Sequence, residues 1–250
     1  GVVYTPKRLA DFVASLIRSE ATRDNYNIQT ILDPACGEGA LLEAMKRNGK
    51  NSERFFGIDI DKDTITGLYD QIDERTELFC RDAILPTKTC RTAIFWRRKF
   101  PKVSVIIANP PWSSEKIYDR QELISAGFNL VTGQYDSYVL FLELAYEIVD
   151  DGGYIGFIIP DSIFDSQNEH LRRFLTQKMQ IRVIARLGEK IFEEVNRAVT
   201  VIVCRKVVPS EDDITMCFRL NTEQRKKFLT SDIPLDYFYN RAKHPVKQAR

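Results

Sequence analysis

The sequence contains an apolar, β-branched run that ends abruptly in two prolines. Val103-Ser104-Val105-Ile106-Ile107-Ala108 predicts a buried strand, and Asn109-Pro110-Pro111-Trp112 follows it directly. Because proline has no N–H to donate, the backbone must leave the sheet there, with carbonyls that have no competing N–H donors beside them. The asparagine amide and the flat tryptophan ring could then hold a planar molecule that bears an amino group. Alone, the stretch also fits an ordinary proline-rich loop after a core strand.

Strands and helices alternate along the first part of the chain. Thr30-Ile31-Leu32-Asp33 predicts a short strand, followed by a glycine-containing turn and a helix. Phe55-Phe56-Gly57-Ile58-Asp59 predicts the second strand, residues 60–72 a helix, and residues 76–82 a third strand. An acid roughly twenty residues beyond a glycine turn is where nucleotide-binding folds place an acceptor for ribose hydroxyls.

The alternation continues beyond the proline pair. Residues 138–149 predict an apolar helix and residues 154–160 a buried strand, and Ser166-Gln167-Asn168-Glu169 predicts a capping box that opens the next helix. Residues 181–187 and 198–204 predict an antiparallel pair, because the connection between them is too short for a crossover helix. The pattern as a whole predicts an α/β fold with a mostly parallel sheet covered by helices on both faces.

Four other stretches lead to more local expectations. At the N-terminus, Thr5 is expected to cap a helix with Pro6 in its first position. The basic stretch 86–102 is expected to be a solvated loop, with contact to a DNA backbone as the alternative. Residues 113–134 show no strong periodicity and predict a long loop. The polar tail predicts one strand, over residues 214–220.

Side chains with useful chemistry recur where the predicted strands end. In a mostly parallel sheet these ends meet at one edge, and ligands bind there near the point where the strand order reverses. The residues concerned are Asp33, Asp59, Asp82, Asn109 and Phe192. One such placement could be accidental, but five at the same edge predict a binding site.

Composition excludes several classes of protein. The five cysteines are scattered without a CxxC pair, and the two histidines are isolated, so neither a disulfide framework nor a metal site is expected. No apolar run is long enough to predict a membrane span and no signal-peptide pattern is visible. The scattered cysteines favour a protein of the reducing cytoplasm. The net charge of +1 does not suggest a chain that binds nucleic acid with its whole surface.

The motifs, taken together, resemble the gamma-class N6-adenine DNA methyltransferases of bacterial restriction–modification systems. The resemblance lies in Tyr4-Thr5-Pro6, in Asp33-Pro34-Ala35-Cys36-Gly37-Glu38-Gly39, in Asp59 and Asp82, and in Asn109-Pro110-Pro111-Trp112, in that order. It covers residues 3–206 and implies the S-adenosylmethionine-dependent methyltransferase fold. That fold is a doubly wound, mostly parallel seven-stranded sheet whose last strand is antiparallel.

The resemblance also implies roles for individual residues. Asn109 and the Pro110 carbonyl would accept hydrogen bonds from the exocyclic amine of a flipped adenine, and Trp112 and Phe192 would stack on that base. The catalytic group would therefore be Asn109, Pro110, Pro111, Trp112 and Phe192. The residues implied to bind S-adenosylmethionine are Tyr4, Thr5, Pro6, Asp33, Pro34, Ala35, Cys36, Gly37, Gly39, Asp59, Asp82, Ala83 and Asn109. No covalent intermediate is needed, so Cys36 need not be a nucleophile.

Simpler interpretations stay open for several of these residues. Phe192 could be an ordinary core phenylalanine, and Tyr4 a core aromatic that anchors the first helix. Asp59 and Asp82 could be helix caps or turn acids, and Cys36 a small residue packed in a tight turn. The Gly37–Gly39 turn lacks the full GxGxxG pattern, which argues against a nicotinamide dehydrogenase.

Two rival functions use the same motifs. The same chemistry could methylate a protein glutamine amide or an RNA base amine, or the chain could be a non-catalytic cofactor-binding module of a larger complex. For the leading hypothesis, residues 1–206 are expected to form the catalytic domain, and residues 207–250 an extension towards a target-recognition domain. That domain, or a specificity subunit outside this chain, and double-stranded DNA are the expected partners.

Overall fold

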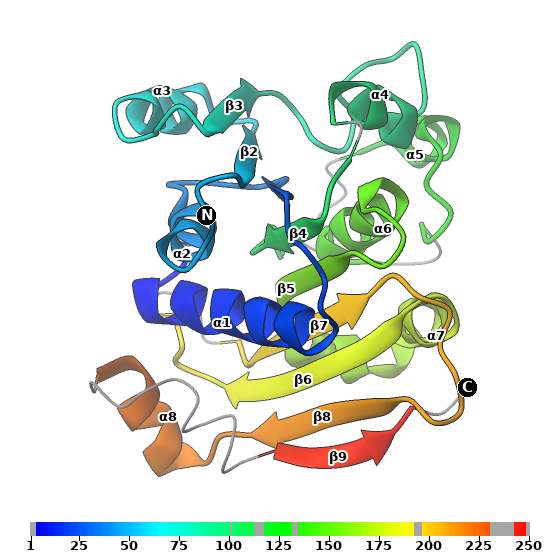
Figure 1. The fold of residues 1–250 in the computed structure, drawn as a ribbon. Coiled ribbons are helices and arrows are strands. Elements are labelled where there is room, and N and C mark those ends of the chain that lie inside the picture. Colours follow the sequence, from blue (N-terminus) through cyan, green and yellow to red (C-terminus); the bar gives the residue numbers. More distant parts are fainter. Residues whose placement is uncertain are drawn as a thin grey trace.

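A single mixed sheet runs through the molecule (Figure 1). The computed structural model describes residues 4–100, 102–112, 118–131, 135–192, 197–230 and 243–248. Within these residues the strand order is β3-β2-β1-β4-β5-β7-β6-β8-β9. The strands are β1 (Thr30–Asp33), β2 (Arg54–Asp59), β3 (Thr76–Cys80), β4 (Val105–Ala108), β5 (Tyr154–Pro160), β6 (Gln180–Gly188), β7 (Val199–Arg205), β8 (Ile214–Arg219) and β9 (Lys243–Lys247).

The first seven strands form the predicted sheet. The strands β3, β2, β1, β4 and β5 are parallel to one another, and β7 is antiparallel to both β5 and β6. Two further strands extend this sheet beyond β6, with β8 parallel to β6 and β9 antiparallel to β8. The sequence predicted only the first of these two, because such strands at the border of a sheet are partly exposed and lack a continuous apolar pattern.

Helices cover both faces of the sheet. They are α1 (Lys7–Arg23), α2 (Ala40–Arg47), α3 (Lys62–Tyr69), α4 (Thr92–Lys99), α5 (Arg120–Ala126), α6 (Tyr138–Ile148), α7 (Glu169–Lys178) and α8 (Thr222–Thr230), with 3₁₀ turns at Asp161–Phe164 and Ser166–Asn168. Buried side chains of α1, α2, α3 and α8 form one core cluster. Those of α4, α5, α6 and α7 form a second one. The doubly wound arrangement is therefore confirmed.

The first helix begins one residue later than predicted. Pro6 precedes α1 with an extended backbone (φ −56°, ψ 137°), and no side chain caps the helix. The Pro6 carbonyl instead accepts from the Ala10 N–H at 3.0 Å. The fixed φ of proline suits both the residue before a helix and the first residue of the helix, so only ψ decides whether Pro6 is helical. The predicted capping role of Thr5 is wrong, and its hydroxyl is used elsewhere.

The basic stretch before β4 contains a helix, where the sequence predicted a loop. Trp96 of α4 is fully buried and its Nε1 donates to the Ala83 carbonyl at 2.8 Å. The basic residues dominate the composition and hide the one buried face of this short helix. Because α4 leads into the start of β4, its basic end lies at the opposite edge of the sheet from Asn109. Arg97 there donates to the Glu147 carbonyl at 2.9 Å.

Two more local predictions need correction. Residues 120–126 form α5, although residues 113–117 and 132–134 of the predicted loop lie outside the described part of the chain. The predicted capping box at Ser166 is wrong, because Ser166–Asn168 forms a 3₁₀ turn and α7 begins at Glu169 without a side-chain cap. None of the helices in the described ranges is both long and apolar enough to cross a membrane.

Candidate active site

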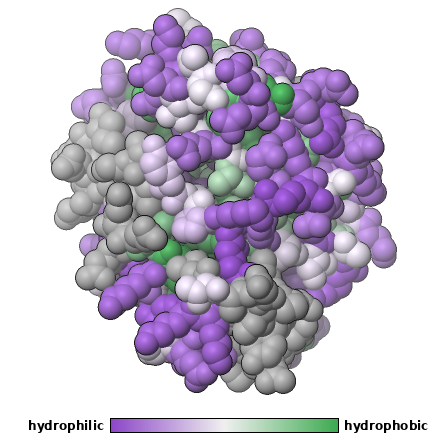
Figure 2. All heavy atoms as spheres, turned by 90° about the vertical axis from the view of Figure 1, so that its left-hand side faces the viewer, coloured by the Kyte–Doolittle hydropathy of each residue, from purple (hydrophilic) through white to green (hydrophobic). Residues whose placement is uncertain are grey.

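The carboxyl ends of the parallel strands meet at one edge of the sheet. The arrows of β4, β6 and β8 point to the left in Figure 1, and Figure 2 shows the molecule from that side. Hydrophilic side chains cover most of this face, and hydrophobic atoms are visible mainly in recesses between them. Asp33, Asp59 and Asn109 lie at or directly after strand ends on this edge. The order reverses at β1, which has β2 on one side and β4 on the other.

The turn after β1 is tied to the end of β2. The backbone N–H of Cys36 donates to the Ile58 carbonyl at 2.9 Å, and that of Gly37 donates to Asp59 Oδ2 at 2.8 Å. Gly37 and Gly39 have φ of +48° and +78°, a region that side-chain-bearing residues rarely adopt. A Cβ at Gly37 would meet no atom within 4 Å, so the turn presents bare backbone to an open space.

Asp33 lies beneath this turn with one unused oxygen. Its Oδ1 accepts from the Ala35 N–H at 3.0 Å, which supports the turn, whereas Oδ2 is buried and has no partner within the described chain. Burial, with a further contribution from the charge of Asp59, raises the pKa of Asp33 to about 8. A buried carboxyl with an unpaired oxygen fits the amino group of a cofactor.

Asp59 and Asp82 are both turn acids, and neither caps a helix. Asp59 Oδ1 accepts from the Asp61 N–H at 2.9 Å, and it is Asp61 that caps α3. Asp82 Oδ1 accepts from the Ile84 N–H at 2.8 Å and from the Tyr118 hydroxyl at 3.1 Å. A carboxylate has about four acceptor positions, so both acids keep capacity for a ligand's hydroxyl or amino group.

Tyr118 is a residue of this site that the sequence did not reveal. It lies in the stretch without periodicity between Trp112 and α5, so no pattern marked it. Its hydroxyl donates to Asp82, and burial and the negative charge of Asp82 raise the pKa of Tyr118. The phenol therefore stays protonated and holds the Asp82 side chain in place.

The Asn109 side chain is oriented by the segment before α1. Its Nδ2 donates to the Thr5 hydroxyl at 3.1 Å, which leaves Oδ1 as the end of the amide that can accept from a ligand. No group in the described part of the chain donates to the next carbonyl, that of Pro110. Tyr4 is 57% exposed, so it is not the core aromatic that the simpler interpretation required.

The last two residues of the motif are held by the protein through their backbone. Ser137 Oγ donates to the Pro111 carbonyl, and Arg197 Nη1 donates to the Trp112 carbonyl at 2.9 Å. The Trp112 ring packs against both core clusters, and its Nε1 donates to the Ile158 carbonyl at 3.3 Å. The sequence did not single out Ser137 or Arg197, because both are ordinary polar residues beside apolar elements.

Phe192, which follows β6, lies beside Trp112. The ring centroids are 5.5 Å apart with an interplanar angle of 78°, and Phe192 is 3% exposed. In this structure Phe192 is therefore a core residue next to the site, and its stacking on a base stays a prediction.

Cys36 has the features of a packed residue in a tight turn. It is 5% exposed, and burial raises the pKa of its thiol, so the nucleophilic thiolate is not available. Within the described ranges, no group of three or more histidine, cysteine or acidic side chains could hold a metal ion.

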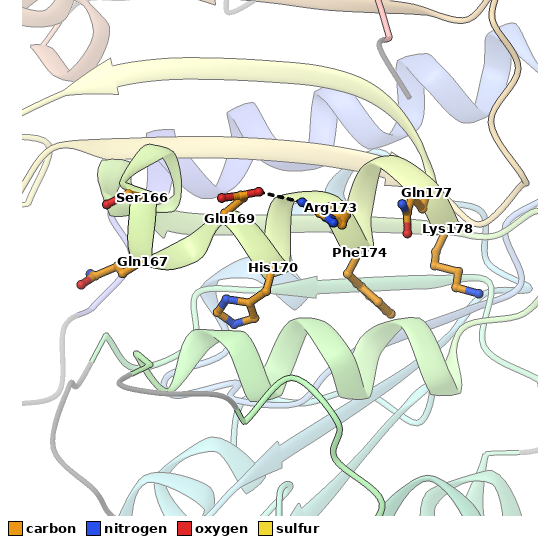
Figure 3. Close-up of a pocket in the computed structure, with 8 residues that line it drawn as sticks. All are labelled: Ser166, Gln167, Glu169, His170, Arg173, Phe174, Gln177 and Lys178. Atoms are coloured by element: carbon orange, nitrogen blue, oxygen red, sulfur yellow. Dashed lines mark hydrogen bonds and ion pairs between the residues drawn. The ribbon is translucent and has the colours of Figure 1, made fainter.

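A cavity elsewhere on the surface does not belong to this site. Figure 3 shows that the side chains lining it come from α7 and the turn before it, with Glu169 and Arg173 paired to each other. None of these residues is a strand-end residue of the candidate site, so the cavity adds nothing to its chemistry.

Comparisons with known proteins identify relatives of this chain. The chain is 28% identical over 226 residues to the type II methyltransferase M.VspI of Vibrio sp. (strain 343), covering 89% of this chain and 52% of that protein. It is 30% identical over 214 residues to M.BanIII of Aneurinibacillus aneurinilyticus, covering 77% and 36%. The chain thus spans about half or less of the length of these curated relatives.

A solved structure shares the fold. The type I restriction-modification methyltransferase subunit from Streptococcus thermophilus superposes with a TM-score of 0.70 at 16% identity, covering 98% of this chain and 56% of that one. The sequence model of one family, the Eco57I restriction-modification methylases, matches residues 51–192, which include Asp59, Asp82, the Asn109–Trp112 motif and Phe192. By this match over more than half of its length, the chain belongs to the Eco57I restriction-modification methylase family.

Proposed function

We propose that this chain transfers the methyl group of S-adenosylmethionine to the exocyclic N6 amine of a flipped adenine in DNA, as part of a restriction–modification or phage-defence system. The observation that supports it most directly is the Asn109–Thr5 hydrogen bond. It turns the Asn109 amide so that Oδ1 is free to accept, next to the Pro110 carbonyl, which has no hydrogen-bond donor among the described residues. Two acceptors side by side match the two hydrogens of an aromatic amine.

The strand-end residues fit S-adenosylmethionine. The unpaired Asp33 Oδ2 can accept from its amino group, and the bare backbone at Gly37 can lie against it. Asp59 can accept from the ribose hydroxyls, and Asp82, held by Tyr118, from the adenine amine, with Ala83 beside the ring. When bound, the cofactor supplies an electrophilic methyl group on a positively charged sulfur.

The protein contributes to the reaction mostly by positioning the target amine and the methyl donor, and by electrostatic stabilisation. The lone pair of an adenine amine is delocalised into the ring, and two acceptors on its hydrogens favour a pyramidal nitrogen with a localised pair. With the base held by Asn109 Oδ1 and the Pro110 carbonyl, the amine nitrogen would take the methyl group that the cofactor supplies. The bonding pair would stay with the sulfur of the demethylated product, and the surplus amine proton would pass to solvent water. Fixed acceptors lower this barrier because they need no reorganisation during the reaction.

A stacked adenine cannot reach a site at this edge of the sheet, so base flipping belongs to the proposal. Trp112 offers its ring to the flipped base, with Phe192 next to it. Family membership and the relatives named as type II methyltransferases support DNA as the substrate. Tyr4-Thr5-Pro6 supports DNA too, because this motif precedes the cofactor turn in the order that resembles the gamma-class DNA methyltransferases.

The partners follow from the same proposal. Residues 1–206 would form the catalytic domain, and residues 207–250 would lead towards a target-recognition domain or specificity subunit, which selects the sequence in double-stranded DNA. Relatives of which this chain covers only 52% and 36% are consistent with such an additional part.

The deciding experiment measures transfer of labelled methyl from S-adenosylmethionine to unmethylated genomic DNA by the full-length protein. Product nucleosides are identified by mass spectrometry. The wild type should form N6-methyladenine, and Asn109→Ala should lower the rate at least 100-fold, because loss of a fixed polar contact at a reacting group costs on the order of 10²–10³. Asn27→Ala, at an exposed asparagine paired only with Lys50, is the matched control.

Three outcomes would refute parts of the proposal. Equal rates for wild type and Asn109→Ala would exclude the mechanism. Transfer to RNA or to a glutamine-containing peptide in preference to DNA would support the rival substrates. Cofactor binding without transfer to any of these would support a non-catalytic module.

A further inference from the structure

Three segments that are far apart in the sequence meet behind the Trp112 backbone. Asp136 and Ser137 lie just before α6, and Arg197 lies just before β7. Arg197 donates to the Trp112 carbonyl at 2.9 Å, and Ser137 to the neighbouring Pro111 carbonyl. Both contacts are made to Pro111 and Trp112, the two residues of the motif that are not proposed to contact the amine of the target base.

Asp136 fixes the arginine. Its side chain is 8% exposed, and its Oδ2 is 3.3 Å from Arg197 Nη2. The same oxygen accepts from Ser162 Oγ at 3.3 Å. A carboxylate buried this deeply needs a counter-charge, and Arg197 supplies it. The guanidinium is therefore held at one end by Asp136 while its other nitrogen contacts Trp112.

The contacts of Arg197 also restrain the ring of Trp112. The guanidinium carbon of Arg197 lies 6.0 Å from the ring centroid, within the range of a cation–π contact. The ring nitrogen is held separately by the Ile158 carbonyl of β5. Trp112 is thus restrained at its backbone by Arg197 and at its indole nitrogen by the sheet.

We propose that Arg197 is a positioning residue, which with Asp136 holds Trp112 in place to receive the flipped base. This inference rests on the proposed function. Arg197 touches neither base nor cofactor, and acts through Trp112. It follows that loss of Arg197 should slow methyl transfer without weakening the cofactor site, whose acids lie at or just after the ends of β1, β2 and β3.

The test uses the full-length protein with unmethylated genomic DNA and compares four variants. Arg197→Ala removes both contacts, and Arg197→Lys keeps the charge opposite Asp136 but has a single donor group in place of the guanidinium fork. The double variant Arg197→Met/Asp136→Asn removes both charges, so that no unpaired carboxylate stays buried. Arg173→Ala, at a surface arginine paired with Glu169, is the matched control.

Two readouts separate positioning from general loss of structure. The first is kcat for methyl transfer beside the Kd of S-adenosylhomocysteine. The second is iodide quenching of tryptophan fluorescence, which needs no activity. The chain has two tryptophans, and Trp96 is fully buried, so iodide reaches chiefly the half-buried Trp112.

We expect Arg197→Ala and the double variant to lower kcat at least tenfold and to raise the quenching constant at least twofold, with the cofactor Kd within twofold of wild type. Arg197→Lys should recover part of both effects, and Arg173→Ala should change neither. Unchanged kcat and quenching in folded Arg197→Ala would overturn the inference, and so would a parallel loss of cofactor binding in the double variant. A wild-type protein without transfer activity would refute the proposed function alone, since the quenching comparison would still test the placement of Trp112.

Discussion

At the scale of single residues, the Thr5 hydroxyl orients the Asn109 amide. The two ends of an amide differ in whether they donate or accept, so the hydrogen bond that one end makes decides which end faces the ligand. Thr5 accepts from Nδ2 at 3.1 Å and thereby leaves Oδ1 for the substrate.

Replacement of Thr5 by valine should therefore slow methyl transfer about tenfold, since one hydrogen bond contributes about 1–1.5 kcal/mol. Thr5→Ser keeps the hydroxyl and should retain most of the activity. Initial rates with saturating cofactor and DNA measure the effect. A valine variant as fast as the serine variant would show that Asn109 needs no such orientation.

We expect Asp33 to make cofactor binding depend on pH. Burial raises the pKa of Asp33 to about 8 in the free protein, so the carboxyl is largely protonated at neutral pH. A cationic amino group beside Oδ2 favours the carboxylate, so binding releases a proton below that pKa. Affinity should thus rise with pH, by up to about tenfold per unit, and level off near the free pKa.

Calorimetric titration of S-adenosylhomocysteine between pH 6 and pH 8 checks this prediction, with pH values chosen from the raised pKa of Asp33. Asp33→Asn should bind more weakly, with little dependence on pH. The same shift has a consequence for stability. Because the folded state keeps a proton that the unfolded state loses above pH 3.8, Asp33 makes the free energy of unfolding decrease as pH rises towards the folded pKa. If the affinity of the wild type for S-adenosylhomocysteine did not change with pH, the amino group of that ligand would not lie beside Asp33.

At the scale of elements, α8 and β8 are packed against the methyltransferase sheet and the first helix. Phe228 of α8 and Phe218 of β8 lie edge-on to Phe12 of α1, at centroid distances of 5.1 and 5.9 Å. Phe228 is fully buried in the same core cluster as α1 and α2. These contacts favour a single folding unit that includes residues 214–230.

Phe228→Ala should accordingly lower the free energy of unfolding of the whole chain by about 3–5 kcal/mol, the usual cost of such a truncation in a core. Urea unfolding followed by circular dichroism and by tryptophan fluorescence should give coincident transitions. Val208→Ala, at a side chain that is 81% exposed, is the control and should change stability by less than about 0.5 kcal/mol. Two separate transitions would show that the last elements fold independently.

At the scale of the whole molecule, charge and length both predict weak DNA binding by these 250 residues alone. The net charge is +1, and the basic end of α4 lies at the edge opposite to the candidate site. Non-specific affinities are about 10⁻⁴–10⁻⁶ M at physiological salt, and the chain should fall in this range with a shallow salt dependence. Fluorescence anisotropy with labelled duplexes measures both, and tight sequence-specific binding would contradict the proposal of a separate recognition domain.

Much of the fold and of the site could be predicted from the sequence, where the signal is local. A buried parallel strand needs a continuous apolar run, and Val105–Ala108 and Tyr154–Pro160 have one. Two prolines after β4 end its ladder regardless of context, and Gly37 and Gly39 are needed for positive φ in the turn after β1. These features determine the order of the elements and bring Asp33, Asp59 and Asn109 to one edge.

Only the tertiary structure decided which distant groups complete the site. Three hydrogen bonds join residues that are 36, 104 and 85 positions apart in the chain: Tyr118 to Asp82, Asn109 to Thr5, and Arg197 to Trp112. Single polar residues leave no periodic pattern, and whether a hydroxyl caps a helix or holds an amide depends on what the fold places next to it. The sequence by itself therefore determined the strand ends and the turn chemistry, because backbone sterics and apolar burial act locally. The partners that orient these side chains depend on contacts between segments, which exist only once the sheet has formed.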